Sequence, residues 1–116
     1  MSSQVVLNLP YFDRVFPITY EQDGEVIGAV DVVIRRNARK NTCYALIDDL
    51  VVVESHRGKG ISRILMDAAI ARAKKEKCYK VIANSHRRRK AARGLYLSMG
   101  FRSYATEFRL DIDEAK

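Results

Sequence analysis

Six residues near the middle of the chain have the composition of a phosphate-binding loop. Residues 57–62 read RGKGIS, with two glycines around a lysine and an arginine in front of them. An apolar run ends just upstream and helix-periodic sequence follows at once, so the loop is expected between a strand and a helix. The first amides of a helix lack an intrahelical acceptor and carry partial positive charge, and glycines let an anion approach them closely. The segment therefore predicts a pyrophosphate site, although a glycine-bearing turn with solvated cations would have the same composition.

Two adjacent carboxylates, Asp48 and Asp49, are the first candidates for a catalytic base. They lie within the apolar run that precedes the loop. An unpaired carboxylate is costly to bury, so this position indicates either a function or a structural ion pair. Neighbouring strand residues point to opposite faces, so only one of the two can face a cleft unless a bulge intervenes. The pair is therefore interpreted either as a candidate general base or as a structural ion-pair partner.

Basic residues gather a second time between positions 86 and 93, in the run HRRRK followed by Arg93. One interpretation is a solvated helix start, but the dipole disfavours cations at a helix N-terminus. A second is a clamp for the phosphates of a cofactor or for an acidic acceptor. A nucleic-acid site is the weaker third, since no aromatic residues are interleaved. His86 has an intrinsic pKa near 6.5 and could act as a base, but a solvated loop histidine is the simpler interpretation.

The elements that must position these groups follow from periodicity and turn signals. Asp23-Gly24 between two apolar runs is a hairpin signal, and Gly100 is a helix cap. The helix after the glycine loop is expected to bury one face, made of Ile61, Ile64, Leu65, Ala68 and Ala71. We expect strands at Val5–Leu9, Val15–Tyr20, Val26–Arg36, Cys43–Val53, Tyr79–Ala83 and Phe101–Ile112, and helices at Gly60–Lys77 and Lys90–Met99. This order predicts an α/β (α+β) fold with a mixed, mostly antiparallel sheet flanked by helices.

Composition bounds the classes of protein to consider. A chain of 116 residues is expected to form a single domain, 1–116, and its net charge of +7 favours anionic partners. The first residues do not resemble a signal peptide, and no apolar run approaches the roughly 20 residues of a membrane span. The two cysteines, Cys43 and Cys78, have no metal or redox spacing and are expected to be small buried hydrophobes in a reducing compartment. These features predict a cytoplasmic protein without a membrane partner.

Two motifs in this sequence resemble those of the GCN5-related N-acetyltransferases, the GNAT family. Residues 57–62 look like the signature Q/R-x-x-G-x-G/A, with Ser62 at the last small position. The stretch AARGLYLSMGF, residues 91–101, is similar to the family's A-x-x-L-Y-x-x-x-G-F. The resemblance covers about residues 26–112, and the stretches IDDLVVV and CYKVIA look most like the glucosamine-phosphate branch. It implies a GNAT-like sheet.

The resemblance implies that acetyl-CoA is the acetyl donor. Its pyrophosphate would lie on the amides of Gly58–Arg63, and its pantetheine arm would run along Leu50–Val52 like an added strand. Asn84 could accept a hydrogen bond from the pantetheine arm. Arg89 departs from the family pattern, because relatives often have an asparagine at this position, seven residues before the tyrosine. The implied cofactor-binding residues are Leu50, Val51, Val52, Arg57, Gly58, Lys59, Gly60, Ile61, Ser62, Arg63, Asn84 and Arg89. No metal is implied.

The resemblance also assigns catalytic roles. Tyr96 matches the family's acid, which reprotonates the leaving thiolate. In the amino-sugar-phosphate branch a carboxylate stands at the position of Asp48, which makes it the preferred base ahead of Asp49. Asn84 lies where some relatives have a glutamate, so it could orient a water, and His86 remains an alternative base.

One expected part is missing. Relatives usually have two helices after the first strand, which form a wall of the acceptor site, but only residues 10–14 separate the first two predicted strands here. A second subunit could supply that wall. The sequence predicts an acetyl-CoA-dependent N-acetyltransferase that acts by direct transfer on a primary amine of a small molecule or polypeptide. The acceptor could be acidic or phosphorylated, and the protein could form a homodimer. The alternatives are a non-catalytic acyl-CoA-binding module or a basic nucleic-acid-binding protein.

Overall fold

The computed structural model describes residues 2–9, 13–37, 39–85 and 89–113. The chain divides into two compact units, Met1–Asn84 and Ser85–Lys116. The first unit contains four strands and the longer helix, and the second contains the shorter helix. The candidate loop and both candidate bases lie in the first unit, whereas Tyr96 and Arg89 lie in the second. His86 falls outside the described residues.

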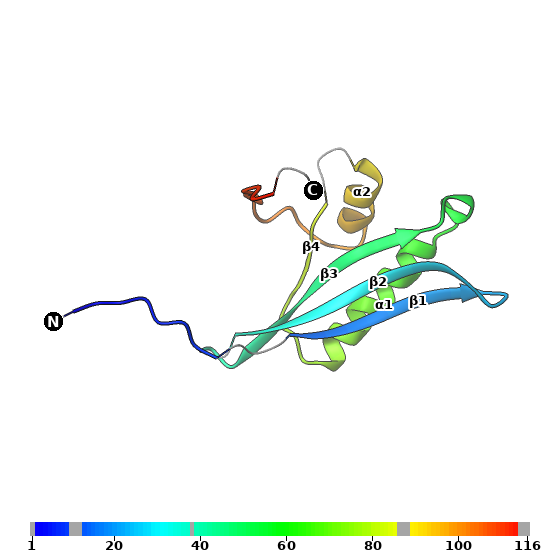
Figure 1. Ribbon diagram of the computed structural model, residues 1–116. Helices are drawn as coiled ribbons and strands as arrows, with labels where there is room; N and C mark the ends of the chain where they lie inside the picture. The colour runs from blue at the N-terminus through cyan, green and yellow to red at the C-terminus, as the bar shows by residue number, and fades with distance from the viewer. Residues whose placement is uncertain (1, 10–12, 38, 86–88, 114–116) are drawn as a thin grey trace. The chain divides into compact units, whose positions relative to one another are not determined.

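The first unit is built on a mixed sheet with the strand order β1-β2-β3-β4 (Figure 1). Its strands are β1 (Arg14–Gln22), β2 (Glu25–Asn37), β3 (Thr42–Val52) and β4 (Val81–Ala83). The first three are antiparallel to one another, and β4 is parallel to β3. Asp23 and Gly24 join β1 to β2 with φ angles of 52° and 78°, as a tight hairpin turn requires. The predicted hairpin and mixed sheet are confirmed.

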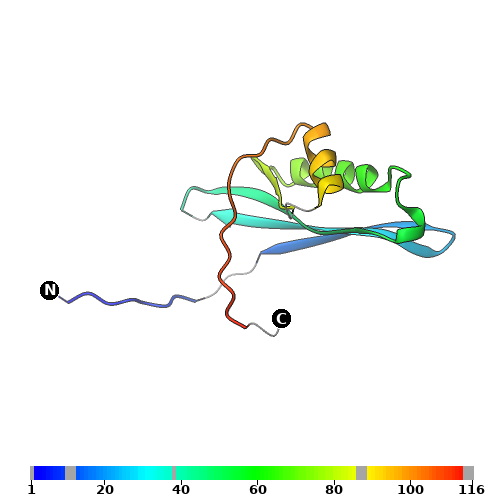
Figure 2. The same ribbon diagram turned by 90° about the horizontal axis from the view of Figure 1, so that it is seen from above.

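The helix α1 (Ile61–Lys75) lies along one face of this sheet (Figure 2). Leu65 and Met66 are almost fully buried there, and each contributes about 1.5–3 kcal/mol through burial. The remaining buried hydrophobic residues of this unit are Ile61, Ala69 and Ala73 in the helix and Ile27, Val30, Val32, Ile34, Ala45, Ile47 and Val52 in the sheet. At Gly28 an added Cβ would lie 3.0 Å from Leu65 Cδ1, so glycine permits the close approach of helix and sheet.

The predicted helix is confirmed, but its predicted apolar face is partly wrong. Ile61 and Leu65 are buried as expected, whereas Ile64 is 49% exposed and Ala68 and Ala71 are exposed as well. Two overlapping sets of apolar residues in this helix have the same i, i+3, i+4 spacing. The set that packs against the sheet is Ile61, Leu65, Met66, Ala69 and Ala73. The packed stripe continues through small alanines, which allow the backbone to approach the sheet.

The second unit contains α2 (Lys90–Ser98), close to the predicted bounds. Gly100 follows with φ of 92°, and its amide donates to the Leu97 carbonyl at 3.2 Å. The amide of Phe101 donates to the Tyr96 carbonyl at 3.0 Å, which completes a Schellman motif. The same motif brings the rings of Tyr96 and Phe101 to a centroid separation of 5.6 Å. The predicted glycine cap is confirmed.

Two predicted strands are wrong. Neither Val5–Leu9 nor Phe101–Ile112 forms a strand, and apart from Phe101 their large apolar side chains are exposed, Phe108 and Ile112 at 92%. Alternation of apolar and polar residues is a local property, but a strand exists only when a second strand satisfies its backbone groups. Between residues 2–9 and β1 no helix occurs in the part of the chain that the structure describes. Among the described residues, no helix is long and apolar enough to span a membrane.

Candidate functional site

The glycine loop connects the end of β3 to the start of α1, as its sequence predicts. A short 3-10 turn, η1 (Glu54–His56), comes between the strand and the loop. Gly58 and Gly60 have φ angles of 78° and 80°, and residues other than glycine rarely adopt this backbone conformation. A Cβ added at either glycine would meet nothing within 4 Å. Backbone conformation therefore explains why glycine stands at both positions, and the space beside them is open.

The start of α1 leaves its first amides without a side-chain acceptor. Gly60 is the N-cap residue and has no side chain to cap them, and the first turn contains no acidic residue. The first intrahelical bond runs from the Ile64 amide to the Gly60 carbonyl at 3.2 Å. The amides of residues 61–63 are thus oriented toward the loop, where the helix dipole favours an anion.

The two cations of the loop have different surroundings. The Nε of Arg57 donates a hydrogen bond to the Val52 carbonyl at 3.1 Å, so this side chain ties the loop to the end of β3. Lys59 is exposed. Arg63, in the first turn, lies 3.9 Å from the Asp67 carboxylate one turn later. Lys59 is therefore the loop cation best placed to meet an anion from solvent, while Arg57 also has a structural task.

A second feature is the free edge of β3 beside the loop. The short strand β4 pairs with β3 only over residues 45–47. From Asp48 to Val52, β3 has no strand neighbour on this side among the described residues. Its backbone amides and carbonyls there can accept an extended ligand in the manner of an added strand. The end of β3 thus offers a backbone edge directly before the helix start.

A β-bulge interrupts β3 at the two candidate carboxylates. Asp48 pairs with Asp31 and Val51 pairs with Ala29, so two residues of β3 lie opposite one residue of β2. Asp49 is the bulge residue and has φ of 52°, a conformation that aspartate tolerates better than most side chains. Both carboxylates are exposed, so the cost of burying a charge in this strand does not arise.

Asp48 lies on the sheet face opposite α1, because its neighbour Ile47 is buried beneath the helix. Directly across the strand pair on the same face is Asp31, which is partly exposed. Sequence reasoning missed Asp31. Its pairing follows from the register of β2 and β3, and the bulge makes that register unreadable from spacing alone.

Asn84 follows β4 directly and is exposed. Since Ala83 pairs with Ile47, the next position along β4 corresponds to Asp48 on β3. Asn84 and Asp48 therefore stand at the point where the two parallel strands cease to pair. This is the position in which a polar side chain could hold a water near the free edge of β3.

In the second unit, Tyr96 is only 9% exposed. Burial raises the pKa of its hydroxyl, and this effect outweighs the opposite influence of Arg89, so Tyr96 keeps its proton at neutral pH. Arg89 is the exposed residue that precedes α2. No group of three or more histidine, cysteine, aspartate or glutamate side chains that could hold a metal occurs in the described ranges.

A strand leads through a glycine loop to an uncapped helix N-terminus beside a free strand edge, and this arrangement is suited to an extended ligand that carries phosphate. The chain belongs to the acetyltransferase (GNAT) family, whose model matches residues 4–101. The resemblance noted in the two sequence motifs is thereby confirmed.

Individual relatives agree with this assignment. The chain is 28% identical over 94 residues to a glucosamine 6-phosphate N-acetyltransferase from Trypanosoma brucei brucei, an alignment that covers 80% of this chain and 62% of that protein. A putative acetyltransferase from Agrobacterium tumefaciens superimposes with a TM-score of 0.77 and 28% identity, over 84% of this chain and 68% of that one. An acetyltransferase from Trypanosoma brucei has a TM-score of 0.73 and 26% identity, over 84% and 69%. The chain therefore spans less than two thirds of the curated relative.

Proposed function

We propose that this protein transfers the acetyl group of acetyl-CoA to a primary amine by direct transfer. The observation that carries the proposal is the open start of α1, where the amides of residues 61–63 lack a side-chain cap and follow two left-handed glycines. A pyrophosphate would satisfy these amides, and Lys59 would add a full positive charge. The free edge of β3 would hold the amides of the pantetheine arm as an added strand.

The proposed cofactor-binding residues act in three groups. Leu50, Val51 and Val52 would offer backbone groups, and Arg57 would hold the loop against the strand end through its bond to the Val52 carbonyl. The loop and first turn would bind phosphate, through Gly58, Lys59, Gly60, Ile61, Ser62 and Arg63. Asn84 and Arg89 would contribute polar contacts to the cofactor. The bulge at Asp49 directs β3 out of regular pairing just before this edge, which supports an extended ligand there.

The proposed chemistry needs one base and one acid. Asp48, exposed on the face opposite α1, would accept a proton from the ammonium form of the acceptor, so that the neutral amine can attack the thioester carbon. Asp49 would instead maintain the bulge. Tyr96, whose pKa is raised by burial, would donate a proton to the leaving thiolate. The nearby Asp31 adds negative charge beside Asp48 and would attract the acceptor's ammonium group.

Release of the CoA thiol in the presence of a panel of primary amines tests the activity. We expect amine-dependent release and an acetylated product of matching mass. The panel pairs glucosamine 6-phosphate with glucosamine, since the trypanosomal relative is named for the phosphorylated sugar and the net charge of +7 favours an acidic acceptor. Tight CoA binding without transfer to any amine would favour a non-catalytic acyl-CoA-binding module.

We also propose a cytoplasmic homodimer in which 1–116 acts as one acetyltransferase domain. Support comes from residues 101–112, where Tyr104, Phe108, Leu110 and Ile112 recur at even positions and are 79–92% exposed. Arg109 and Asp111 form an ion pair of 2.7 Å at odd positions. Such an amphipathic segment requires a sheet partner, and a second copy would supply one.

Sedimentation velocity tests the dimer. Phe108→Ser combined with Leu110→Ser is expected to shift the protein to a monomer, because burying these side chains contributes about 1.5–3 kcal/mol each. Glu107→Gln, on the polar side of the same segment, is the matched control and should remain dimeric. A monomer at all concentrations for the unsubstituted chain would contradict the proposal.

A further inference from the structure

Two cysteines meet at the end of α1 remote from the glycine loop, and the proposed acetyl transfer does not use them. Cys43 is the second residue of β3, and Cys78 follows α1 by three residues. Their sulfur atoms lie 3.7 Å apart, both thiols are free, and both side chains are partly exposed. The sequence-based expectation that both cysteines are buried is wrong, because each is only partly buried, and their contact with each other was not predicted.

Backbone hydrogen bonds bring the two cysteines together. After α1, Lys77 adopts a left-handed φ of 62°, and the Cys78 amide donates to the Ala73 carbonyl at 3.0 Å in a Schellman motif. The next amide, that of Tyr79, donates to the Cys43 carbonyl at 3.0 Å. The helix cap and the hydrogen bond to β3 thus fix the backbone next to both cysteines. Closure to a disulfide requires the sulfurs to move together by about 1.7 Å, toward a bond length of about 2.05 Å.

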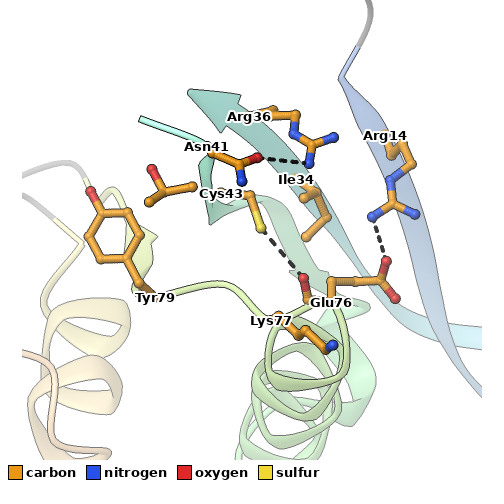
Figure 3. A pocket seen from close by; sticks show the side chains of 9 residues that line it. Arg14, Ile34, Arg36, Asn41, Cys43, Glu76, Lys77 and Tyr79 are labelled. Atoms are coloured by element: carbon orange, nitrogen blue, oxygen red, sulfur yellow. Dashed lines mark hydrogen bonds and ion pairs between the residues drawn. The ribbon is translucent and has the colours of Figure 1, made fainter. Parts of the chain in front are cut away.

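An open pocket of about 650 Å³ borders Cys43 (Figure 3). Cys43 is part of its wall, and its thiol also donates to the Glu76 carbonyl at 3.4 Å, whereas Cys78 does not line the pocket. Arg14, Arg36 and Lys77 line the pocket. Glu76, which is paired with Arg14, is the single acidic side chain among the described lining residues. A reagent that enters the pocket therefore meets net positive charge and reaches Cys43 first.

We propose that Cys43 and Cys78 form a reversible intramolecular disulfide, and that the cationic pocket admits its oxidant, an anionic small-molecule disulfide of the oxidised-glutathione type. Cys43 loses its proton and attacks one sulfur of that disulfide. A mixed disulfide forms, and one small thiolate leaves and takes up a proton. Cys78 then loses its proton and attacks the Cys43 sulfur, which releases the second small thiolate. Two electrons pass from the protein dithiol to the small disulfide, and the two thiol protons reach the two released thiols.

The surroundings of Cys78 agree with its acting second. Burial, and then the adjacent Cys43 thiol, raise the pKa of Cys78 from 9.0 to about 11. A thiol that ionises so poorly begins exchange with a dissolved disulfide slowly. A mixed disulfide on Cys43 would instead place the target sulfur at contact distance, so that proximity offsets the low thiolate fraction of Cys78.

The cross-link would enclose the element that carries the proposed cofactor site. Residues 44–77 contain nearly all of β3, the glycine loop and α1. The helix has 15 residues and spans about 22 Å, so the disulfide would lie far from the loop and leave its amides open. Oxidation should stabilise this unit without blocking the loop. The inference does not depend on the acetyltransferase proposal.

The test uses the full chain, first reduced and then incubated with oxidised glutathione. After remaining thiols are alkylated, mass spectrometry should show both cysteines protected in an intramolecular disulfide. The melting temperature should rise by about 5–15 °C and return on reduction. Two alkylated cysteines and an unchanged melting temperature would overturn the proposal, as would cross-links only between chains.

Single substitutions test the order of events. Cys78→Ser should accumulate the mixed disulfide at Cys43, whereas Cys43→Ser should leave Cys78 largely unmodified. Cys78→Ala and Cys43→Ala repeat the comparison without a hydroxyl, and melting of the reduced variants verifies folding. Faster modification of Cys78 than of Cys43 would refute the assigned order.

Charge substitutions test the pocket. Arg36→Gln with Lys77→Gln should slow oxidation by oxidised glutathione at least about threefold, while oxidation by the neutral hydroxyethyl disulfide stays unchanged. Equal rates for the variant and the unsubstituted chain, or equal slowing with both reagents, would remove the pocket from the proposal.

Discussion

Replacing Gly60 by aspartate places a carboxylate at the N-cap of α1, where the proposed pyrophosphate would bind. Gly60 has φ of 80°, and no atom lies within 4 Å of the position of an added Cβ. Sterically the side chain therefore fits, and its cost is the strain of a left-handed residue, about 1 kcal/mol for aspartate. A carboxylate at this position also interacts favourably with the partial positive charge of the helix start, by about 0.3–1 kcal/mol. The two effects nearly cancel, so the free energy of unfolding should change by less than about 1 kcal/mol.

CoA binding should change much more. At about 5 Å, two unit charges repel by about 0.8 kcal/mol in water and by about 3 kcal/mol at an effective dielectric constant of 20. The carboxylate also competes for the amides of residues 61–63. We expect the dissociation constant for CoA to rise at least about tenfold, equivalent to about 1.4 kcal/mol.

Isothermal titration with CoA measures this change, and Gly60→Asn is the matched control. Asparagine has nearly the same shape and tolerates the same backbone region, so the difference between the two variants isolates the charge. That difference should shrink as salt is added, because ions screen the repulsion. If folded Gly60→Asp binds CoA as tightly as Gly60→Asn, the start of α1 is not the pyrophosphate site.

Four further predictions follow from the same geometry. Asp48→Asn should lower turnover at neutral pH while CoA affinity stays unchanged, and a pH–rate profile should show that its turnover partly recovers at higher pH. Loss of turnover in Asp49→Asn but not in Asp48→Asn would make Asp49 the base. In urea titrations, Asp49→Gly should keep or raise the free energy of unfolding. Asp49→Val should lower it by about 1–3 kcal/mol, because position 49 has a positive φ that valine adopts only with strain. Equal free energies of unfolding for the two variants would show that the bulge imposes no such strain. Tyr96→Phe should reduce turnover about 100-fold without weakening CoA binding, and unchanged turnover when chemistry limits the rate would leave Tyr96 a packing residue. The pKa of Cys78 is about 11 in the folded protein and near 9.0 in the unfolded chain. The free energy of unfolding of the reduced protein should therefore fall as the pH rises from 9 to 11. An equal fall in the free energy of unfolding of a reduced Cys78→Ser variant would contradict this.

The sequence alone determined the features that depend on local backbone chemistry. The hairpin at Asp23-Gly24, the glycine loop before α1 and the cap at Gly100 all need backbone angles that few residues adopt. Each can be predicted because its cause lies within a few residues. The family motifs lie in these same segments, which explains why the proposed cofactor loop was accessible to sequence reasoning.

Tertiary structure decided what depends on partners distant along the chain. Residues 101–112 alternate like a strand but have no strand partner in the described structure. Which stripe of α1 faces the sheet depended on packing beneath Met66. The bulge that separates the roles of Asp48 and Asp49 depends on the register with β2.

The contact of Cys43 with Cys78 shows the same limit most clearly. Their positions differ by 35 residues, and no spacing rule connects them. They meet because the cap of α1 returns the chain to the start of β3, where the Tyr79 amide binds the Cys43 carbonyl. Local sequence dictates each turn of the backbone, but which side chains those turns bring together is settled only when helix and sheet pack.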